Sequence, residues 1–225
     1  KWCVLRYPNP SMAQAAERST EDFAEFYFNV CCLDYAKMSQ AMDPLHALLE
    51  KTDRVEIKGP GTDLSFSIKG LPAVKCDGGR NIPDGEVYTA PVKDSIEGTI
   101  QYNTPTIYQG TTHEDVFFRF EQGRIVEAKS TNTEHLIEVL DADEGSRYIG
   151  EFSLGFHPHI LEPMKDILFD EKIGGTIHMA FGAGFPECKS QNHSAIHWDM
   201  ICDMRDGGQI FVDDELMYES GEFKI

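Results

Sequence analysis

Residues Arg54 to Ile68 read RVEIKGPGTDLSFSI, and this stretch decides the fold class. Apolar and polar residues alternate on both sides of Gly59-Pro60-Gly61, which is the pattern of strands that bury one face. The alternating apolar residues are Val55, Ile57, Leu64, Phe66 and Ile68. Glycine and proline between the two halves favour a turn. The stretch therefore predicts a β-hairpin, the simplest unit of an antiparallel sheet.

Helical patterns precede this hairpin. Ser19-Thr20 before Glu21-Asp22 is typical of a capped helix start with acidic residues in its first turn. Apolar residues then recur at helical spacing, so we predict one amphipathic helix from there to about Met42. Asp43-Pro44 predicts the start of a second, short helix, because proline is tolerated in a first turn. The apolar stripe of that helix would be Leu45, Leu48 and Leu49.

Short strands continue from the hairpin to the end of the chain. The segments that we expect to contain them are Tyr88, Ile100–Tyr102, Val116–Phe120, Ile125–Ala128, Gln209–Val212, Glu215–Tyr218 and Phe223–Ile225. Glu134 to Asp141 is one further helical patch. No repeat or low-complexity linker divides the chain. Helices near the N-terminus that are separate from mostly antiparallel strands predict a single α+β domain over residues 1–225.

The charge balance excludes two classes of partner. Lys and Arg number 20 against 38 Asp and Glu, which gives a formal net charge of −18 among 225 residues. Such a chain repels phosphate backbones and anionic lipid headgroups, so we expect neither nucleic acid nor a membrane as a partner. No apolar run approaches the length of about 18 residues that a membrane-spanning helix needs.

The start of the chain and its cysteines indicate in which cellular compartment the protein is found. The chain begins Lys1-Trp2-Cys3, without an initiator methionine or a secretory signal pattern, so we expect a piece of a longer protein. Its six cysteines form no C-x-x-C pair, and Cys31-Cys32 has poor geometry for a disulfide. We therefore expect reduced thiols in the cytoplasm, each a buried small hydrophobe rather than a metal ligand.

The most informative chemistry lies in SAIHWDMI, residues Ser194–Ile201. In a strand, His197 and Asp199 would share one face and the apolar residues between them the other. An imidazole and a carboxylate two residues apart suit a divalent cation, although a hydrogen-bonded His–Asp pair gives the same pattern. The segment Thr176–Phe181 repeats the arrangement with His178 on its polar face. For these two strands, a metal site and a satisfied core histidine are equally good interpretations.

Carboxylates also stand in strand-like runs, at Glu86 and Glu151. Each alone is typical of a solvated edge position, but together they supply the anionic partners that a dinuclear cation site needs. Gly182 and Gly184 form a G-x-G, but Pro186 follows and no helix opens there. This excludes a dinucleotide-binding fingerprint.

Six motifs are specific enough to suggest a family. They are WCVLR (2–6), PSMAQ (10–14), NIPDGEVYTAP (81–91), GE (150–151), FDE (169–171) and SAIHWD (194–199). Together they resemble the aminopeptidase T family, the thermophilic aminopeptidases that include aminopeptidases S and II, over essentially the whole chain. The resemblance implies a homodimeric, dinuclear metallopeptidase that removes N-terminal residues from peptides. It also implies that residues 1–225 are the carboxy-terminal catalytic domain, with a further amino-terminal domain absent from this chain.

The resemblance implies two divalent metal ions and a set of six ligands. These are Glu86, Glu151, Glu171, His178, His197 and Asp199. Glu151 would be the catalytic residue that bridges both ions, although bridging makes it a compromised base, so the proton acceptor is left open among the site carboxylates. Four carboxylates carry four negative charges, which two divalent ions cancel. Zn, Co, Mg and Mn all fit such mixed ligands.

Two departures from the family pattern bear on function. Phe185 stands seven residues after His178, where the family has a tyrosine whose phenol could hydrogen-bond a tetrahedral intermediate. The spacing from Glu171 to His178 is also longer than the family's. The alternative to a peptidase is therefore a non-catalytic metal- or peptide-binding domain, inactive because of Phe185 or the missing amino-terminal domain. A third interpretation is a dimerisation domain that uses Met12, Met38 and Met42.

Overall fold

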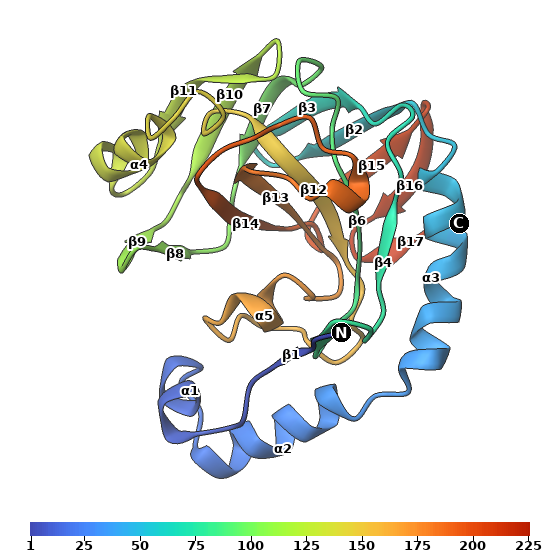
Figure 1. The fold of residues 1–225 in the computed structure, drawn as a ribbon, viewed down its shortest axis with the longest axis vertical. Coiled ribbons are helices and arrows are strands. Elements are labelled where there is room, and N and C mark those ends of the chain that lie inside the picture. Colours follow the sequence, from blue (N-terminus) through green and yellow to red (C-terminus); the bar gives the residue numbers. More distant parts are fainter.

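Two antiparallel sheets face each other across one apolar core in the computed structural model, which describes all residues 1–225 (Figure 1). The larger sheet has eight strands, in the order β11-β10-β7-β3-β2-β15-β16-β17. Its strands are β2 (Arg54–Gly59), β3 (Thr62–Ser67), β7 (Glu97–Gln101), β10 (Phe117–Glu121), β11 (Arg124–Lys129), β15 (Gln209–Val212), β16 (Glu215–Glu219) and β17 (Glu222–Phe223). The predicted hairpin is its centre: Val55 pairs with Phe66 and Ile57 with Leu64.

The smaller sheet has five strands, in the order β14-β13-β12-β6-β4, and every neighbouring pair is antiparallel. Its strands are β4 (Val74–Cys76), β6 (Glu86–Thr89), β12 (Ile149–Gly155), β13 (Thr176–Gly182) and β14 (His197–Asp203). Two short pairs complete the strands. β1 (Val4–Leu5) pairs in parallel with β5 (Asn81–Ile82), and β8 (Thr106–Tyr108) forms a hairpin with β9 (Thr111–His113).

Aromatic contacts between the sheets hold the main core together. Phe66 of the larger sheet meets Phe152 of the smaller one edge to face, with ring centroids 5.0 Å apart. Phe118 and Phe181 make a second contact between the sheets, at 4.7 Å. Such pairs add about 0.5–1.5 kcal/mol beyond the burial of their area. The apolar face of the smaller sheet is therefore committed to this core, and its opposite face is left for polar side chains.

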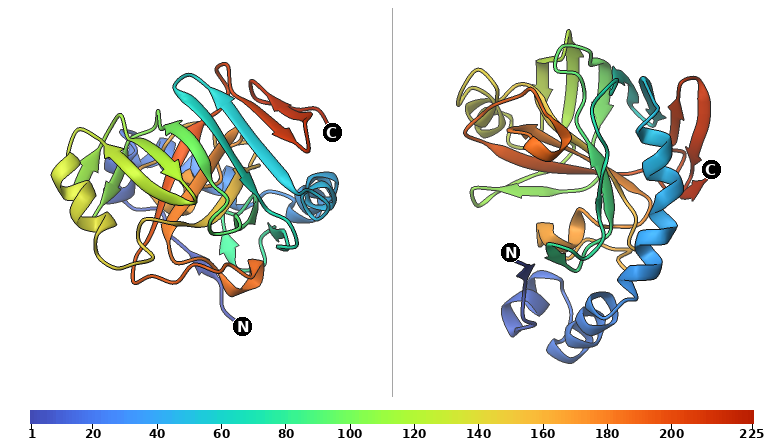
Figure 2. Two further views of the ribbon diagram at one scale, coloured as in Figure 1. Left: turned by 90° about the horizontal axis from the view of Figure 1, so that it is seen from above. Right: turned by 45° about the vertical axis from the view of Figure 1, so that its right-hand side comes forward.

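The N-terminal helices lie outside the sheets, below them and along one side (Figure 2). They are α1 (Pro10–Ala15), α2 (Thr20–Cys31) and α3 (Tyr35–Leu49). The predicted cap is confirmed, because the Ser19 hydroxyl accepts a hydrogen bond from the Asp22 amide. The predicted end at Met42 is wrong: the break falls at Cys32–Asp34, where Asp34 caps α3 by accepting from the Lys37 amide.

The predicted helix start at Asp43-Pro44 is also wrong, because Pro44 lies inside α3. A proline in a helix interior cannot donate a backbone hydrogen bond and usually breaks the helix. Here the buried face continues across it, and this packing against the core outweighs the local cost. That face consists of Met38, Met42, Leu45 and Leu49. Met38 and Met42 are thus core residues, which removes them from the dimer interface suggested above.

Two short helices follow later in the chain. α4 (Thr133–Leu140) confirms the helical patch predicted at Glu134–Asp141. α5 (Ile167–Asp170), which the sequence pattern did not indicate, packs against α1 and α2 in a second apolar cluster. The members of that cluster are Ala13, Phe23, Tyr27, Val30, Ile160, Met164, Leu168, Phe169 and Ile173. The prediction of an α+β domain with mostly antiparallel strands is confirmed.

The cysteines depart from one expectation. All six are free thiols, as predicted, but only Cys188 and Cys202 are buried, and Cys3 and Cys32 are exposed. None of the helices has the length and apolar character needed to cross a bilayer.

Candidate metal centre

The polar face of the smaller sheet carries five of the six predicted ligands. Neighbouring side chains on a strand point to opposite faces, so residues two apart share one face. Ala180 at the middle of β13 pairs with Glu151 on β12 and with Asp199 on β14, which places the two carboxylates on either side of it. His178 and His197 lie two residues from members of this row. Because alanine is small, the row has space between its carboxylates.

The G-E motif has a local reason. A Cβ atom on Gly150 would lie only 2.4 Å from the carbonyl oxygen of Gly182. The pairing of β12 with β13 also shifts register between Ile149 and Glu151. A glycine directly before Glu151 therefore lets the strands approach closely where the ladder is irregular, and this directs the Glu151 carboxylate into the row.

Glu86 enters the cluster from the next strand. It is the first residue of β6 and pairs with Gly155 at the end of β12. Its Oε2 accepts a hydrogen bond of 2.6 Å from the Ser153 hydroxyl, and the side chain is buried. The sequence pattern for Glu86 and Glu151 alone favoured solvated edge positions. The structure contradicts that interpretation, since both lie inside the sheet, at 4% and 3% exposure.

Glu171 reaches the same cluster from outside the sheet. It caps the C-terminus of α5, and one of its carboxylate oxygens lies within 4.8 Å of donor atoms of His178 and Asp199. Phe169, two residues earlier, packs against Phe23 and Tyr27 of α2. The N-terminal helices therefore position Glu171, and its longer spacing from His178 does not carry it away. The structure thus brings all six predicted residues together.

The separations between donor atoms test whether a cation fits. His178 Nε2 lies 3.2 Å from Glu86 Oε2, and His197 Nε2 lies 3.5 Å from Asp199 Oδ1. Donors bound at about 2.1 Å to one tetrahedral ion are about 3.4 Å apart, close to both separations. The donor set therefore fits divalent cations.

Glu151 lies between the two imidazoles. Its Oε1 is 3.7 Å from His178 Nε2, and its Oε2 is 3.8 Å from His197 Nε2. Both separations are too long for hydrogen bonds. One carboxylate thus contributes to two sets of donors, Glu86–Glu151–His178 and Glu151–His197–Asp199.

Burial and neighbouring charges oppose each other in the cluster. Burial raises the pKa of Glu151 above its ordinary value. Burial alone would do the same to Glu86, but the Lys172 ammonium and the His178 ring lower its pKa instead. Burial disfavours a charged His197, yet Asp199 beside it raises the pKa of that imidazole to about 9. Without a cation, the imidazoles are thus drawn toward the protonated form by the carboxylates.

Sequence reasoning missed Lys172. This side chain is completely buried, and its ammonium lies 2.7 Å from Glu86 Oε1 and ion-pairs with Glu171. The count of four negative charges against two divalent ions omitted it. One signal was present: Lys172 directly follows the predicted ligand Glu171, although position alone cannot show that a lysine points inward.

A loop fixed by Asp143 leads into β14. The Asp143 carboxylate accepts hydrogen bonds from the Ala195 amide at 2.6 Å, the Ser194 hydroxyl at 2.9 Å and the Gly145 amide at 2.8 Å. Donation by the Ala195 amide, above all, lowers the pKa of Asp143 to about 2. This aspartate therefore anchors the residues just before His197.

We expect Asp143→Asn to destabilise the protein by about 1 kcal/mol at pH 7, because an amide directs a donor at groups that themselves donate, while solvent screens part of the effect at this half-buried position. Since the folded-state pKa lies below the ordinary value, the contribution of Asp143 is complete above about pH 4 and is lost as the pH falls toward 2. Urea unfolding of both proteins at pH 7 and pH 3 measures this. If the two proteins have the same free energy of unfolding at pH 7, or differ more at pH 3 than at pH 7, Asp143 is not the anchor of this loop.

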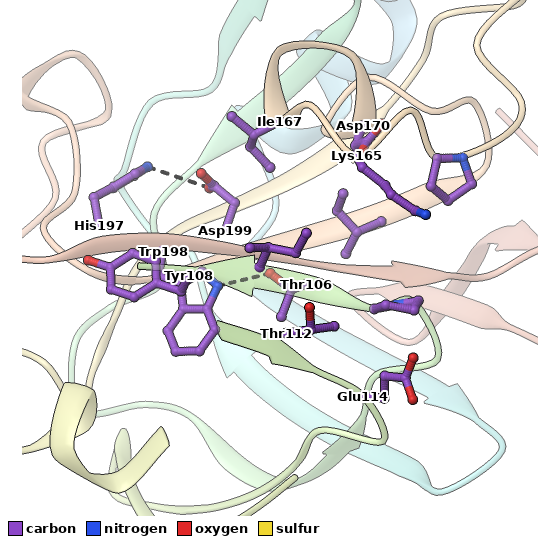
Figure 3. A pocket seen from close by; sticks show the side chains of 14 residues that line it. Thr106, Tyr108, Thr112, Glu114, Lys165, Ile167, Asp170, His197, Trp198 and Asp199 are labelled. Atoms are coloured by element: carbon purple, nitrogen blue, oxygen red, sulfur yellow. Dashed lines mark hydrogen bonds and ion pairs between the residues drawn. The ribbon is translucent and has the colours of Figure 1, made fainter. Parts of the chain in front are cut away.

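A cavity of about 590 Å³ opens beside the outer end of the cluster (Figure 3). His197 and Asp199 line it together with Tyr108, Trp198, Ile167 and Asp170. Trp198 stacks on Tyr108 with ring centroids 4.5 Å apart and donates a hydrogen bond of 2.9 Å to Thr106. The β8–β9 hairpin is thereby fixed against β14. The cavity has the size and the largely apolar wall of a small-ligand site.

Phe185 lies close to this site. Its ring centroid is 5.0 Å from that of His197 and 5.7 Å from that of Tyr88, and 41% of the residue is exposed. The Phe185 ring therefore lies at the surface and is not packed within the core.

The fold and the site define the class: an α+β domain with a candidate metal centre on one face of an antiparallel sheet. The family model described as thermophilic metalloprotease (M29) matches residues 1–223. The chain belongs to this family, which confirms the resemblance seen in its motifs.

Individual relatives agree with this membership. Aminopeptidase T of Thermus thermophilus is 32% identical over 98% of this chain, and aminopeptidase AmpS of Bacillus subtilis is 34% identical over 56% of it. The solved structure of wild-type AmpT from Thermus thermophilus covers the whole chain with a TM-score of 0.88 at 26% identity. A 2,5-dihydroxypyridine dioxygenase from Pseudomonas putida KT2440 shares the fold, with a TM-score of 0.72 at 16% identity over 98% of this chain and 70% of its own.

The chain is shorter than these peptidases. Its match spans 62% of the length of aminopeptidase T, and the partial match to AmpS spans 33% of that protein. It also covers 65% of the solved AmpT chain.

Proposed function

We propose that residues 1–225 form the catalytic, metal-binding domain of an aminopeptidase that hydrolyses the first peptide bond of peptides and uses two divalent ions. Family membership supports the reaction class, since relatives of this chain are named aminopeptidases. The single observation that carries the two-ion part is Glu151, whose two oxygens face different imidazoles. A carboxylate in that position is suited to bridge two ions.

Each half of the centre has its own ligands under this proposal. Glu86 and His178 would hold the inner ion, His197 and Asp199 the outer ion, and Glu151 both, with Glu171 completing the set. When bound, paired divalent ions polarise a scissile carbonyl and make a water molecule acidic enough to attack at neutral pH. Zn, Co, Mg and Mn each suit these donors. The six free cysteines support a cytoplasmic location as part of the same proposal.

The cavity beside Asp199 supports a peptide as the substrate. Tyr108, Trp198 and Ile167 give it an apolar wall for a side chain. Asp199 and Glu114 also line it, and carboxylates favour the cationic amine of a free peptide N-terminus. His197 is partly exposed, which lets a substrate reach the outer half of the cluster.

Release of p-nitroaniline from a panel of aminoacyl p-nitroanilides tests the proposal directly. The chain, freed of metal with a chelator and then reloaded with Zn²⁺, Co²⁺, Mg²⁺ or Mn²⁺, is expected to hydrolyse at least one member. An N-acetylated version of the best substrate is the matched control, because it lacks the free amine. Hydrolysis of both at equal rates would exclude an aminopeptidase, and hydrolysis by the metal-free chain would exclude metal dependence.

Phe185→Tyr tests the missing phenol. If a hydroxyl at this position stabilises developing negative charge, we expect turnover to rise by up to about 10²-fold with little change in KM, since the gain occurs only in the transition state. The ring is substantially exposed, so the free energy of unfolding should change by less than about 0.5 kcal/mol. Steady-state kinetics and thermal melting on the same preparations measure both. Unchanged turnover in a stable variant would show that this site does not use a phenol there.

Homodimer formation belongs to the proposal as well. Exposed apolar side chains near the N-terminus, Trp2, Leu5 and Tyr7, support it as a contact surface. Sedimentation velocity is expected to show a dimer, and a single monomeric species at micromolar concentration would exclude it.

A further inference from the structure

Lys172 contributes a fixed positive charge to the carboxylate cluster. Its ammonium lies 2.7 Å from Glu86 Oε1, ion-pairs with Glu171 and lies 3.9 Å from Asp84 Oδ1. The side chain has no exposed surface. All the acidic partners of this buried ammonium are carboxylates, which is the pairing that a buried charge requires. Three acidic groups thus surround one ammonium.

Lys172 contacts the ligands of one half of the centre more than those of the other. Both oxygens of Glu86 are occupied, Oε1 by Lys172 and Oε2 by the Ser153 hydroxyl at 2.6 Å. Glu171, the other partner of Lys172, lies near donor atoms of both His178 and Asp199, so Glu86 is the ligand that ties Lys172 to the inner side. No lysine or arginine pairs with Glu151 or Asp199 at the outer side, where imidazoles are the only cationic neighbours. The inner half therefore already holds a cation, and the outer half does not.

We propose that Lys172 makes the two halves unequal, so that one divalent ion binds tightly at Glu151–His197–Asp199 and a second binds much more weakly at Glu86–Glu151–His178. This inference rests on the two-ion centre of the proposed function. An ion at the inner half must share Glu86 with the ammonium and meets a like charge at close range in a buried environment. An ion at the outer half meets neither obstacle. The chain is thus built to keep one ion and to exchange the other.

Metal titration of the full chain tests this inference without reference to hydrolysis. After chelation, calorimetry with Zn²⁺ or Co²⁺ is expected to resolve two steps of one ion each, with dissociation constants that differ by at least about 100-fold. Elemental analysis after gel filtration at limiting metal should then find one ion per chain. Two ions that bind in one step with equal affinity would overturn the proposal, and this result needs no variant.

Lys172→Met removes the charge and keeps much of the length of the side chain. We expect the weaker step to tighten by at least tenfold and the tighter step to change by less than threefold. Lys69→Met is the matched control: it removes an exposed lysine that pairs with Asp53, and both steps should be preserved. A Lys172→Met protein with an unchanged gap between the two steps would overturn the proposal. If this variant does not fold, the titration of the unmodified chain still decides.

These outcomes separate the inference from the proposed function. Unequal binding in a chain that hydrolyses no aminoacyl substrate supports the role of Lys172 and contradicts the peptidase. Equal binding of both ions by a chain that hydrolyses aminoacyl substrates supports the peptidase and contradicts the role of Lys172. A chain that binds no divalent ion contradicts both.

Discussion

Asp199→Asn is expected to abolish tight binding of the outer ion. Asp199 is one of three donors in that half, and asparagine keeps the shape of the side chain while removing its charge. Loss of a residue that merely orients a ligand typically costs 10- to 100-fold in affinity, so loss of a ligand should cost at least about 100-fold. Hydrolysis should fall to the level of the metal-free chain. Elemental analysis and kinetics on the same preparation measure the two effects.

The same variant should remove the stabilisation that the ion provides. A ligand at 100 times its dissociation constant stabilises the folded state by about 2.7 kcal/mol, which for a chain of this size corresponds to a rise in Tm of about 5–10 °C. Melting with and without a chelator should therefore show this difference in the original protein and not in Asp199→Asn. Asp203→Asn, on the same strand but paired with Arg205, should retain it. An unchanged melting curve after verified metal removal would argue against a cation in the cluster.

Phe169→Ala is expected to produce the largest loss of stability, about 3–5 kcal/mol. The ring is fully buried in the second apolar cluster and lies 6.2 Å from the ring of Phe23 and 5.9 Å from that of Phe26, measured between centroids. Truncation leaves a cavity between α5 and α2. Because Glu171 and Lys172 follow directly, the inner half of the metal centre should also lose affinity. Chemical unfolding and metal titration measure both consequences.

Phe28→Ala provides the comparison, since Phe28 lies on α2 but is half exposed. We expect it to cost less than about 1 kcal/mol and to leave metal binding unchanged. If Phe169→Ala prevents folding, Phe169→Leu should fold and still weaken the inner half. Full affinity at the inner half in a clearly destabilised Phe169 variant would show that α5 is held in place by other contacts.

Local pattern was sufficient for the parts of the fold that local chemistry controls. Alternation of apolar and polar residues predicted the β2–β3 hairpin and the two faces of β13 and β14, because the geometry of a strand alone assigns neighbouring side chains to opposite faces. The Ser19 cap was predicted for a similar reason, since it depends on residues three positions apart. The boundary between α2 and α3 was not predicted. Continuous burial of α3 against the core overrides the preference of Pro44 for a helix start.

The sequence determined the class of fold, and the family that its motifs resemble supplied the six residues that the structure brings together at one centre. Tertiary structure alone decided the rest. Contacts between Phe169 and α2 place Glu171 beside His178, and the same turn buries Lys172 among the carboxylates. The physical reason is that burial and charge pairing arise from residues distant in the chain: Lys172 meets Glu86 across 86 positions. A lysine in solvent and a lysine inside a metal centre follow the same local pattern, and only packing distinguishes them.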